Sequence, residues 1–398
     1  MTASFDPRLP LPAPPDPWAG SEQPSGRLGP PYHMTDMLAA EPHVARRLME
    51  RLAARDSAAA RLADAVREAA SAGRTVVTTG CGTSEHGALA LAEVLRAALV
   101  EAGVPARAGA VVSEQALELA LDPPSSALLI GISHEGGTAA TNRALAAARD
   151  AGSRTALVTA GDGSPGAALA EIVVTTGEMD QSWCHTVGYL APIIAATSVG
   201  GHLTGVPPDA EACVAQLVAG AADEAGAEAI AAQLGGAAHL LVIGSGVDRV
   251  AGRELVLKVE EASWLPSAYR DLETFLHGHL PATDRETGLV LLLTDRRRRI
   301  DRLARARQAL AAAAAVGIRS AAILAAEVAT AIGNELTPAG RLVVPDATDL
   351  PAPVASLLGT ATALQLLTER IARARGSNPD PIRRDDPRYR EASAAAEA

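Results

Sequence analysis

Short apolar runs, each followed by a glycine-containing turn and then by a longer alanine- and leucine-rich stretch, recur along this sequence. Buried strands are predicted at Thr75–Thr79, Leu128–Ile132, Arg154–Thr159, Ile172–Thr176, His239–Ile243, Gly288–Thr294, Ser320–Ala325 and Arg341–Val344. Strands that alternate with helices at this pitch predict an α/β fold of doubly wound, mostly parallel sheets flanked by helices on both faces.

Between these runs the apolar residues recur at helical spacing. Helices are predicted over 85–102, up to Ala151 after the second strand, and over 250–263. An amphipathic helical stretch from Thr35 to about Ala72 precedes the first strand.

The similar order of elements in both halves predicts two α/β domains in tandem, residues 34–208 and 209–376. Residues 1–33 are rich in proline and have few apolar anchors, so they predict an extended or disordered arm. Residues 377–398 form a C-terminal tail.

Composition and charge restrict the class of protein. The 398 residues are 48% apolar and contain only three cysteines, which argues against a disulfide framework and a cysteine metal cluster. A net charge of −11 argues against a general affinity for nucleic acid or anionic lipid. The basic run Arg296–Arg299 is expected to be a solvated helix face rather than a guide for an anionic ligand. Without a signal-peptide pattern or a long apolar run, we expect a cytoplasmic protein that binds a small molecule rather than nucleic acid or a membrane.

Two polar loops follow predicted strands of the first domain, Gly80–Ser84 (GCGTS) and Ser133–Thr138 (SHEGGT). Each leads into a helix N-terminus, where free N–H groups and the helix dipole favour an anion. Both would lie at the C-terminal edge of one sheet, the usual ligand site of open α/β folds. The same residue types also suit plain turns and helix N-caps. No turn carries the complete dinucleotide fingerprint, which argues against an NAD enzyme.

Glu135 conflicts with a simple phosphate site in the second loop. A carboxylate and a phosphate dianion at contact distance repel each other by several kcal/mol unless one charge is neutralised. Either His134 or an arginine compensates Glu135, or the ligand at this loop is not a phosphate.

One predicted helix of the second domain carries candidates for acid–base chemistry. Glu254, Lys258 and Glu261 fall at i, i+4 and i+7 and therefore share a helical face. Of the 35 basic residues, only Lys258 is a lysine, and a lysine can lose its proton, form an imine or fit as a compact ammonium where an arginine cannot. These three charges have two interpretations. They are ordinary ion pairs along a helix, or a catalytic carboxylate base beside a cation that tunes the pKa of the base and stabilises an enolate oxygen. His277 is a second acid–base candidate or a surface histidine.

At these residues the chain resembles the sugar isomerase (SIS) family, specifically the double-SIS isomerase half of glucosamine-6-phosphate synthase and its stand-alone relatives. The similarity covers about residues 34–385. It rests on GCGTS at Gly80–Ser84, Ser113-Glu114, SHEGGT at Ser133–Thr138, LKVEEAS at Leu257–Ser263, and His277-Gly278. The resemblance implies two tandem SIS domains, the first with ligand-binding loops and the second with the catalytic helix.

The resemblance also implies a bound sugar phosphate. The positions implied for substrate binding are Cys81, Gly82, Thr83, Ser84, Ser133, His134, Glu135, Thr138 and Glu254. Glu261 aligns with the base of the aldose–ketose step, Lys258 with an accessory catalytic charge, and His277 with the ring-opening histidine. In that family the histidine reaches the site from the other subunit, so a homodimer with a shared active site is implied. Glu and His suit these roles without a metal or other cofactor.

Several positions depart from the family pattern. Glu135 replaces a serine of the family loop SQSGET, His279 replaces the proline of the His-Gly-Pro motif, and Gly177–Tyr189 matches the corresponding ligand loop poorly. The tail lysine that forms an imine with the ketose falls near Pro387, and Lys258 is the only lysine that could replace it. The start, Met1-Thr2, offers no N-terminal cysteine nucleophile, so we do not expect a glutaminase domain.

These features predict a SIS-type isomerase or deaminase that acts on a sugar phosphate or an amino-sugar phosphate and shuttles a proton between C1 and C2. The alternative is a non-catalytic SIS protein that senses a carbohydrate derivative. Glu135 and the missing tail lysine favour this alternative.

Overall fold

The computed structural model of the chain describes residues 5–14, 27–105, 107 and 109–397. Its strands are β1 (Val76–Thr79), β2 (Val111–Ser113), β3 (Leu128–Ile132), β4 (Arg154–Thr159), β5 (Ile172–Thr175), β6 (His239–Gly244), β7 (Ser267–Asp271), β8 (Thr287–Leu293), β9 (Arg319–Ala325) and β10 (Gly340–Val344). They form two five-stranded parallel sheets, which confirms the predicted α/β fold. The first sheet has the order β2-β1-β3-β4-β5, and the second has the same order, read as β7-β6-β8-β9-β10.

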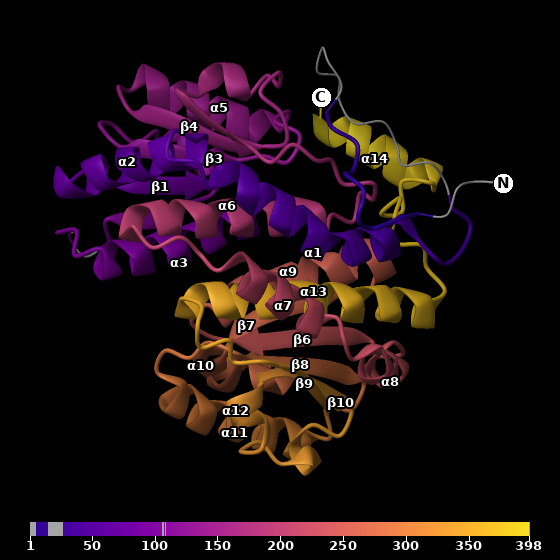
Figure 1. Cartoon of the computed structure of the whole chain (residues 1–398). Helices are drawn as coiled ribbons and strands as arrows, with labels where there is room; N and C mark the ends of the chain where they lie inside the picture. The colour runs from indigo at the N-terminus through magenta and orange to yellow at the C-terminus, as the bar shows by residue number, and fades with distance from the viewer. Residues whose placement is uncertain (1–4, 15–26, 106, 108, 398) are drawn as a thin grey trace.

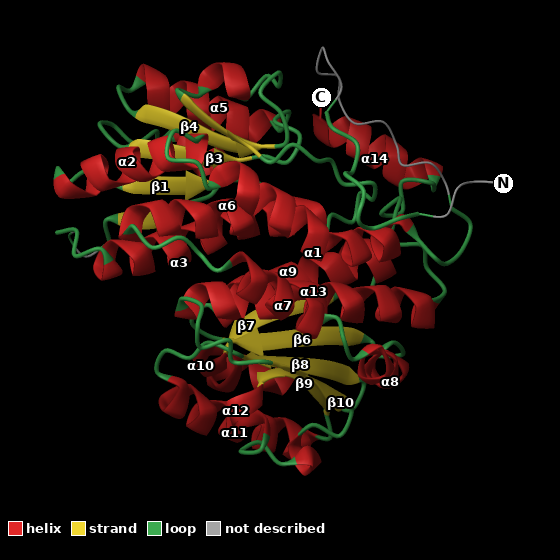
Figure 2. Ribbon diagram, in the orientation of Figure 1, coloured by secondary structure: helices red, strands yellow, loops and turns green. Residues whose placement is uncertain are grey.

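Helices cover both faces of each sheet. Those of the first half are α1 (His33–Leu52), α2 (Ala58–Ser71), α3 (Thr83–Glu101), α4 (Ala116–Leu121), α5 (Ala139–Asp150) and α6 (Val187–Thr204). Those of the second half are α7 (Ala210–Gly220), α8 (Glu224–Leu234), α9 (Asp248–Ser263), α10 (Leu272–Thr274), α11 (Arg299–Val316), α12 (Ala326–Ala329), α13 (Ala352–Arg375) and α14 (Pro387–Glu397). Figures 1 and 2 show a layer of helices, including α1, α6, α9 and α13, between the two sheets.

The apolar pattern explains this layering. All seven residues of β8 are buried, as expected for a parallel strand covered on both faces. The middle helices are buried on most sides, and one continuous core joins Leu95 of α3, Ile193 of α6, Leu255 of α9 and Leu364 of α13. Among the described residues, no helix is long and apolar enough to cross a membrane.

The structure differs from the predicted elements at a few points. The helical stretch from Thr35 to Ala72 is two helices, because Ser57 starts α2 by accepting the backbone N–H of Ala60. Helix α3 begins at Thr83 rather than at Glu85. The edge strands β2 and β7 were not predicted, since β2 has three residues and every residue of β7 is only half-buried.

Both terminal segments contact the segment that follows β5, and the C-terminal one also contacts the start of α1. Leu11 is buried, and its N–H donates to Glu178 after β5, while the Pro12 carbonyl accepts the N–H of Met179. Pro15, Pro17 and Pro24 of the predicted arm lie outside the described residues. In the tail, Asp380 accepts the N–H groups of His33 and Met34 at the start of α1. The division into domains at residue 208 and the tail boundary remain predictions.

Candidate active site

The two predicted loops lie side by side, because β1 and β3 are neighbours and Thr79 pairs with Gly131. In the first loop, α3 takes in Thr83 and Ser84, which are 7% and 9% exposed, so the free loop is shorter than predicted. Gly82 turns the chain into α3 with a φ of +57°, a conformation that favours glycine.

Cys81 and Gly82 are the accessible part of this first loop. Cys81 is half-buried, with its Sγ 3.7 Å from Thr141 Oγ1. Gly82 borders a hollow of about 410 Å³ between α3 and α9, which His86 and Arg253 also line.

The second loop folds partly on itself. The Ser133 hydroxyl accepts the Gly136 N–H at 3.1 Å and lies 3.1 Å from the Thr138 hydroxyl. Gly136 has a φ of +74°, and a side chain at this position would collide with Ser164. The hydroxyl of Ser133 is therefore already engaged within the loop, whereas Thr138 is exposed.

His134 does not compensate the charge of Glu135. Its side chain is buried, and its Nε2 accepts the backbone N–H of Asp180 at 3.0 Å, which requires an unprotonated nitrogen. Burial lowers the pKa of His134 to about 4, so the ring is neutral at pH 7. Among the described residues, Glu135 has no ion-pair partner. The geometry thus favours the expected alternative in which the ligand at this loop is not a phosphate.

Replacing Glu135 by serine is expected to strengthen the binding of glucose 6-phosphate about fivefold. The substitution removes a repulsion of about 1 kcal/mol between the partly exposed Glu135 carboxylate and the phosphate. Isothermal titration calorimetry measures this change, with unphosphorylated glucose as the neutral ligand. Glu286→Gln, which removes an exposed carboxylate of the second domain, is the matched control. Equal or weaker binding by Glu135→Ser would contradict the repulsion argument.

The segment after β5 connects the second loop to α9. Asp180 folds this segment by accepting the backbone N–H groups of Ser182, Thr186 and Gly188. Burial nevertheless raises the pKa of Asp180 to about 6, against these hydrogen bonds and the charge of Lys258.

Two further side chains of the segment face the neighbouring elements. The ring of His185 lies 5.0 Å from that of His134. The thiol of Cys184 is buried, 3.9 Å from the carbonyl oxygen of Lys258. The segment thus spans the distance between the SHEGGT loop and α9.

Helix α9 presents the predicted row of charges, and burial gives its members different roles. Lys258 Nζ lies 2.6 Å from Glu261 Oε2 and 3.6 Å from Glu254 Oε1. The side chains of Lys258 and Glu254 are fully buried, whereas that of Glu261 is 22% exposed. His86 of α3 hydrogen-bonds Glu254 Oε2 at 2.6 Å. Only Glu261 of the row can therefore meet a ligand.

The electrostatics of the row suit a base. Burial by itself would lower the pKa of Lys258, but the carboxylates of Glu261 and Glu254 outweigh burial and raise it, so the ammonium stays charged. Burial raises the pKa of Glu261, and the neighbouring Lys258 charge limits that rise. A carboxylate with a raised pKa accepts a proton more readily than an ordinary surface glutamate.

Glu261 opens into a hollow of about 450 Å³. Trp264 and Leu265 line it from the end of α9 and beyond, and Ile382, Arg383 and Tyr389 line it from the C-terminal tail. The tail thus takes part in the site although it lacks the lysine of the family pattern.

His277 lies apart from this hollow. It belongs to the turn Phe275–His279, its side chain is 69% exposed, and its Nδ1 is 2.9 Å from Glu273 Oε1. Within the described residues of one chain, His277 does not line the hollow at Glu261. That a second subunit contributes His277 to this site remains a prediction.

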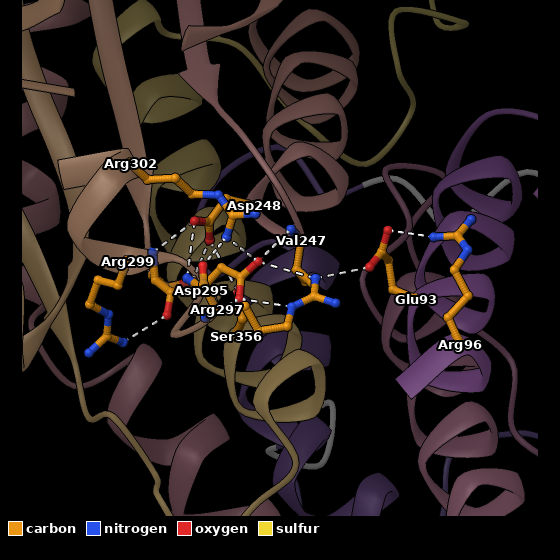
Figure 3. A network of polar contacts seen from close by, with 10 residues as sticks. Glu93, Arg96, Val247, Asp248, Asp295, Arg297, Arg299, Arg302 and Ser356 are labelled. Atoms are coloured by element: carbon orange, nitrogen blue, oxygen red, sulfur yellow. Dashed lines mark hydrogen bonds and ion pairs between the residues drawn. The ribbon is translucent and has the colours of Figure 1, made fainter. Parts of the chain in front are cut away.

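A network of polar side chains lies at the C-terminal end of β8 (Figure 3). Asp248, at the start of α9, accepts the N–H of Asp295 after β8. Asp295 in turn accepts hydrogen bonds from Arg297 and Arg302. Arg297 also reaches Glu93 of α3 at 3.0 Å and so joins the two halves of the chain.

The expectation that Arg296–Arg299 forms a solvated helix face is wrong. Helix α11 begins only at Arg299, so the preceding arginines do not lie along a helix: Arg296 and Arg297 are half-buried, and Arg298 is exposed. Arg299 is 8% exposed and pairs with Glu327 and Asp346.

Among the side chains at the site that were not predicted from the sequence are His86, Asp180 and Arg383. His86 lies three residues after Thr83, and helical spacing could have placed it beside the loop residues. The other two depend on long-range contacts that no local pattern reports. Among the described residues, no group of three or more His, Cys, Asp or Glu side chains is arranged to hold a metal ion.

No protein-family model matches this sequence, and no curated protein sequence matches it. Solved structures do match its fold. The C-terminal domain of glucosamine-fructose-6-phosphate aminotransferase from Francisella tularensis matches with a TM-score of 0.74 and 16% identity, covering 89% of this chain and 99% of that chain.

Two other solved structures match over most of their length. Tagatose-6-phosphate ketose/aldose isomerase from Escherichia coli has a TM-score of 0.66 and 16% identity, with 90% of this chain and 98% of that chain covered. Glucosamine-6-phosphate deaminase from Thermotoga maritima has a TM-score of 0.61 and 14% identity, with 87% and 96% covered. The predicted resemblance is thus confirmed at the level of the fold: the chain has the tandem SIS fold of the phosphosugar isomerases.

Proposed function

We propose that the chain is a cytoplasmic SIS-type isomerase or deaminase of a sugar phosphate or amino-sugar phosphate. The observation that supports this proposal is the partly exposed Glu261 carboxylate, held 2.6 Å from the buried Lys258 ammonium and open to a ligand-sized hollow. The solved structures of similar fold include both a ketose/aldose isomerase and a deaminase.

The proposed chemistry is a proton transfer between adjacent carbons. The Glu261 carboxylate takes the proton from C2 of the open-chain aldose, the electrons of the C–H bond form a C1–C2 double bond, and the C1 oxygen takes a proton from water. The resulting enediol returns its C2 hydroxyl proton to the hydroxide as C1 receives the proton held by Glu261, which gives the ketose.

Lys258 acts from behind Glu261. Because its side chain has no exposed surface, the ammonium cannot touch an enolate oxygen in this structure. It instead fixes the Glu261 carboxylate in place and limits the rise of its pKa. Glu254, equally buried, holds Lys258 and His86 rather than the ligand.

Ring opening requires a second acid–base group. We assign it to His277 of a second copy, in a homodimer with shared sites. Its 69% exposure supports this assignment, because a second subunit can approach the side chain at the surface.

A ligand screen followed by proton exchange tests the proposed function. Hexose and hexosamine 6-phosphates, and their unphosphorylated forms, are first compared by thermal shift, since a ligand of the folded state raises Tm. Ligands that bind are then incubated with the protein in D₂O, and loss of the C2 proton signal is followed by NMR. Ligand binding without exchange would overturn the proposed catalysis.

A non-catalytic SIS sensor is the second candidate. The specific observation in its favour is the tail, which lacks the imine-forming lysine, while the only lysine, Lys258, is buried. A sensor predicts a raised Tm with sugar derivatives and no deuterium at C2, whereas the enzyme predicts both.

A further inference from the structure

The guanidinium of Arg383 lies between two aromatic rings in the hollow that Glu261 lines. Its central carbon is 4.5 Å from the ring centroid of Trp264 and 4.1 Å from that of Tyr389. Aromatic rings attract the faces of a guanidinium and leave its in-plane N–H groups free. The stacking therefore fixes the plane of Arg383 without using its hydrogen-bond donors.

These donors have no acceptor in the part of the chain that the structure describes. Other arginines of the chain pair with carboxylates, as Arg297 does with Glu93 and Asp295. Arg383 forms no ion pair with a described residue, and its side chain donates no hydrogen bond to one. A half-buried, oriented and unpaired guanidinium fits a planar, bidentate oxyanion partner.

The backbone around Arg383 is strained in a way that places this side chain. Ile382 and Arg383 both have positive φ, +42° and +65°, and so has Trp264 at +56°. Non-glycine residues rarely adopt this conformation, and such strain is found preferentially at ligand clamps and active sites. Asp380, which binds the N–H groups at the start of α1, anchors the tail just before this turn.

The charges in the hollow make Arg383 the anion-attracting group there. Its other charged lining residues are Glu260 and Glu261, both carboxylates. Of the two polar loops predicted to favour an anion, GCGTS borders another hollow with Arg253, and SHEGGT carries the uncompensated Glu135. An anionic group of the ligand therefore finds a better partner at Arg383 than at that loop.

We propose that Arg383 binds an oxyanion of the sugar derivative, a phosphate or a carboxylate, in the hollow beside Glu261. This inference rests on the proposed function for the nature of the ligand, but not on catalysis. The C-terminal tail would then bind the ligand through an ion pair of Arg383, where the tail of the family pattern forms an imine through a lysine.

Calorimetry with the full chain tests the proposal. The probes are glucose 6-phosphate, glucuronate, glucose and inorganic phosphate, and the variants are Arg383→Gln and Arg383→Lys. Arg384→Gln is the matched control, because Arg384 also stacks on a tryptophan, Trp183 at 4.0 Å, but does not line the hollow.

We expect the unmodified chain to bind glucose 6-phosphate or glucuronate more tightly than glucose, and the favoured probe identifies the oxyanion. Arg383→Gln should weaken binding of that probe about 10- to 100-fold and leave binding of glucose unchanged. Arg383→Lys, which keeps the charge but loses the bidentate fork, should give a smaller loss. Arg384→Gln should change the affinity less than threefold.

Three results would overturn the proposal: no preference of the unmodified chain for an anionic sugar, unchanged affinity in a folded Arg383→Gln or Arg383→Lys variant, or an equal loss in Arg384→Gln. If the affinity for the anionic sugar falls in Ser133→Ala but not in Arg383→Gln, the oxyanion binds at the SHEGGT loop instead. Because binding is measured without turnover, failure here is distinct from failure of proton exchange in D₂O.

Discussion

Glutamine in place of Glu261 is expected to slow deuterium exchange at C2 of the sugar substrate by at least about 100-fold, because an amide cannot accept the proton. The side chain keeps its size, and its oxygen can still accept the hydrogen bond from Lys258 Nζ, so the hollow should keep its shape. Binding of the same sugar, measured by calorimetry, is therefore expected to change less than threefold. NMR in D₂O measures the exchange rate directly.

Glu260→Gln is the matched control for this experiment. Glu260 precedes Glu261 on α9 and lines the same hollow, but its carboxylate is exposed and accepts the backbone N–H of Ser267. Glu260→Gln removes one charge but keeps the Glu261 carboxylate beside Lys258. The rate of deuterium exchange at C2 should therefore stay within a few fold of that of the unmodified chain. Equal rates in the unmodified chain and Glu261→Gln would exclude Glu261 as the base.

The sequence predicts the central strands because burial on both faces makes them continuous apolar runs. Leu128–Ile132 and Arg154–Thr159 coincide with β3 and β4 residue for residue. The edge strands β2 and β7 leave no such pattern. Every residue of Ser267–Asp271 is only half-buried, and Ser267, Arg270 and Asp271 are polar or charged, so only pairing with β6 defines the segment as a strand.

The candidate site, too, could be predicted from the sequence only in part. The shared face of Glu254, Lys258 and Glu261 follows from helical periodicity alone. Which of the three reaches solvent does not, because tertiary packing buries Lys258 and Glu254 and leaves part of Glu261 exposed. The contact of His86 with Glu254 joins residues 168 positions apart, and no local pattern contains it.

The buried position of Lys258 explains why a lysine is retained in a chain that otherwise uses arginine. Its ammonium has carboxylates of Glu254 and Glu261 on either side and no exposed surface. A guanidinium is larger and carries five N–H donors, all of which would need acceptors in this enclosed space. A compact ammonium with three donors fits where an arginine would leave donors unpaired.

Methionine in place of Lys258 is expected to lower the free energy of unfolding by about 3–5 kcal/mol at pH 7, because the buried Glu254 and the partly buried Glu261 lose the cation that they share. Methionine has a similar length and fills the space, so the loss reports charge rather than a cavity. Urea unfolding followed by tryptophan fluorescence measures the change. Arg307→Met, which removes an exposed cation on α11, is the control and should change stability by less than about 0.5 kcal/mol.

Adding Glu254→Gln and Glu261→Gln to Lys258→Met should recover most of the lost stability, since no buried charge then remains in the row. The pH dependence has a definite sign. In Lys258→Met the uncompensated carboxylates favour protonation in the folded state, so the folded chain binds more protons than the unfolded chain and stability falls as pH rises. The deficit relative to the unmodified chain should therefore shrink from pH 7 to pH 5. A deficit that is independent of pH, or one that the two glutamines do not reduce, would show that Lys258 contributes by packing and not by its charge.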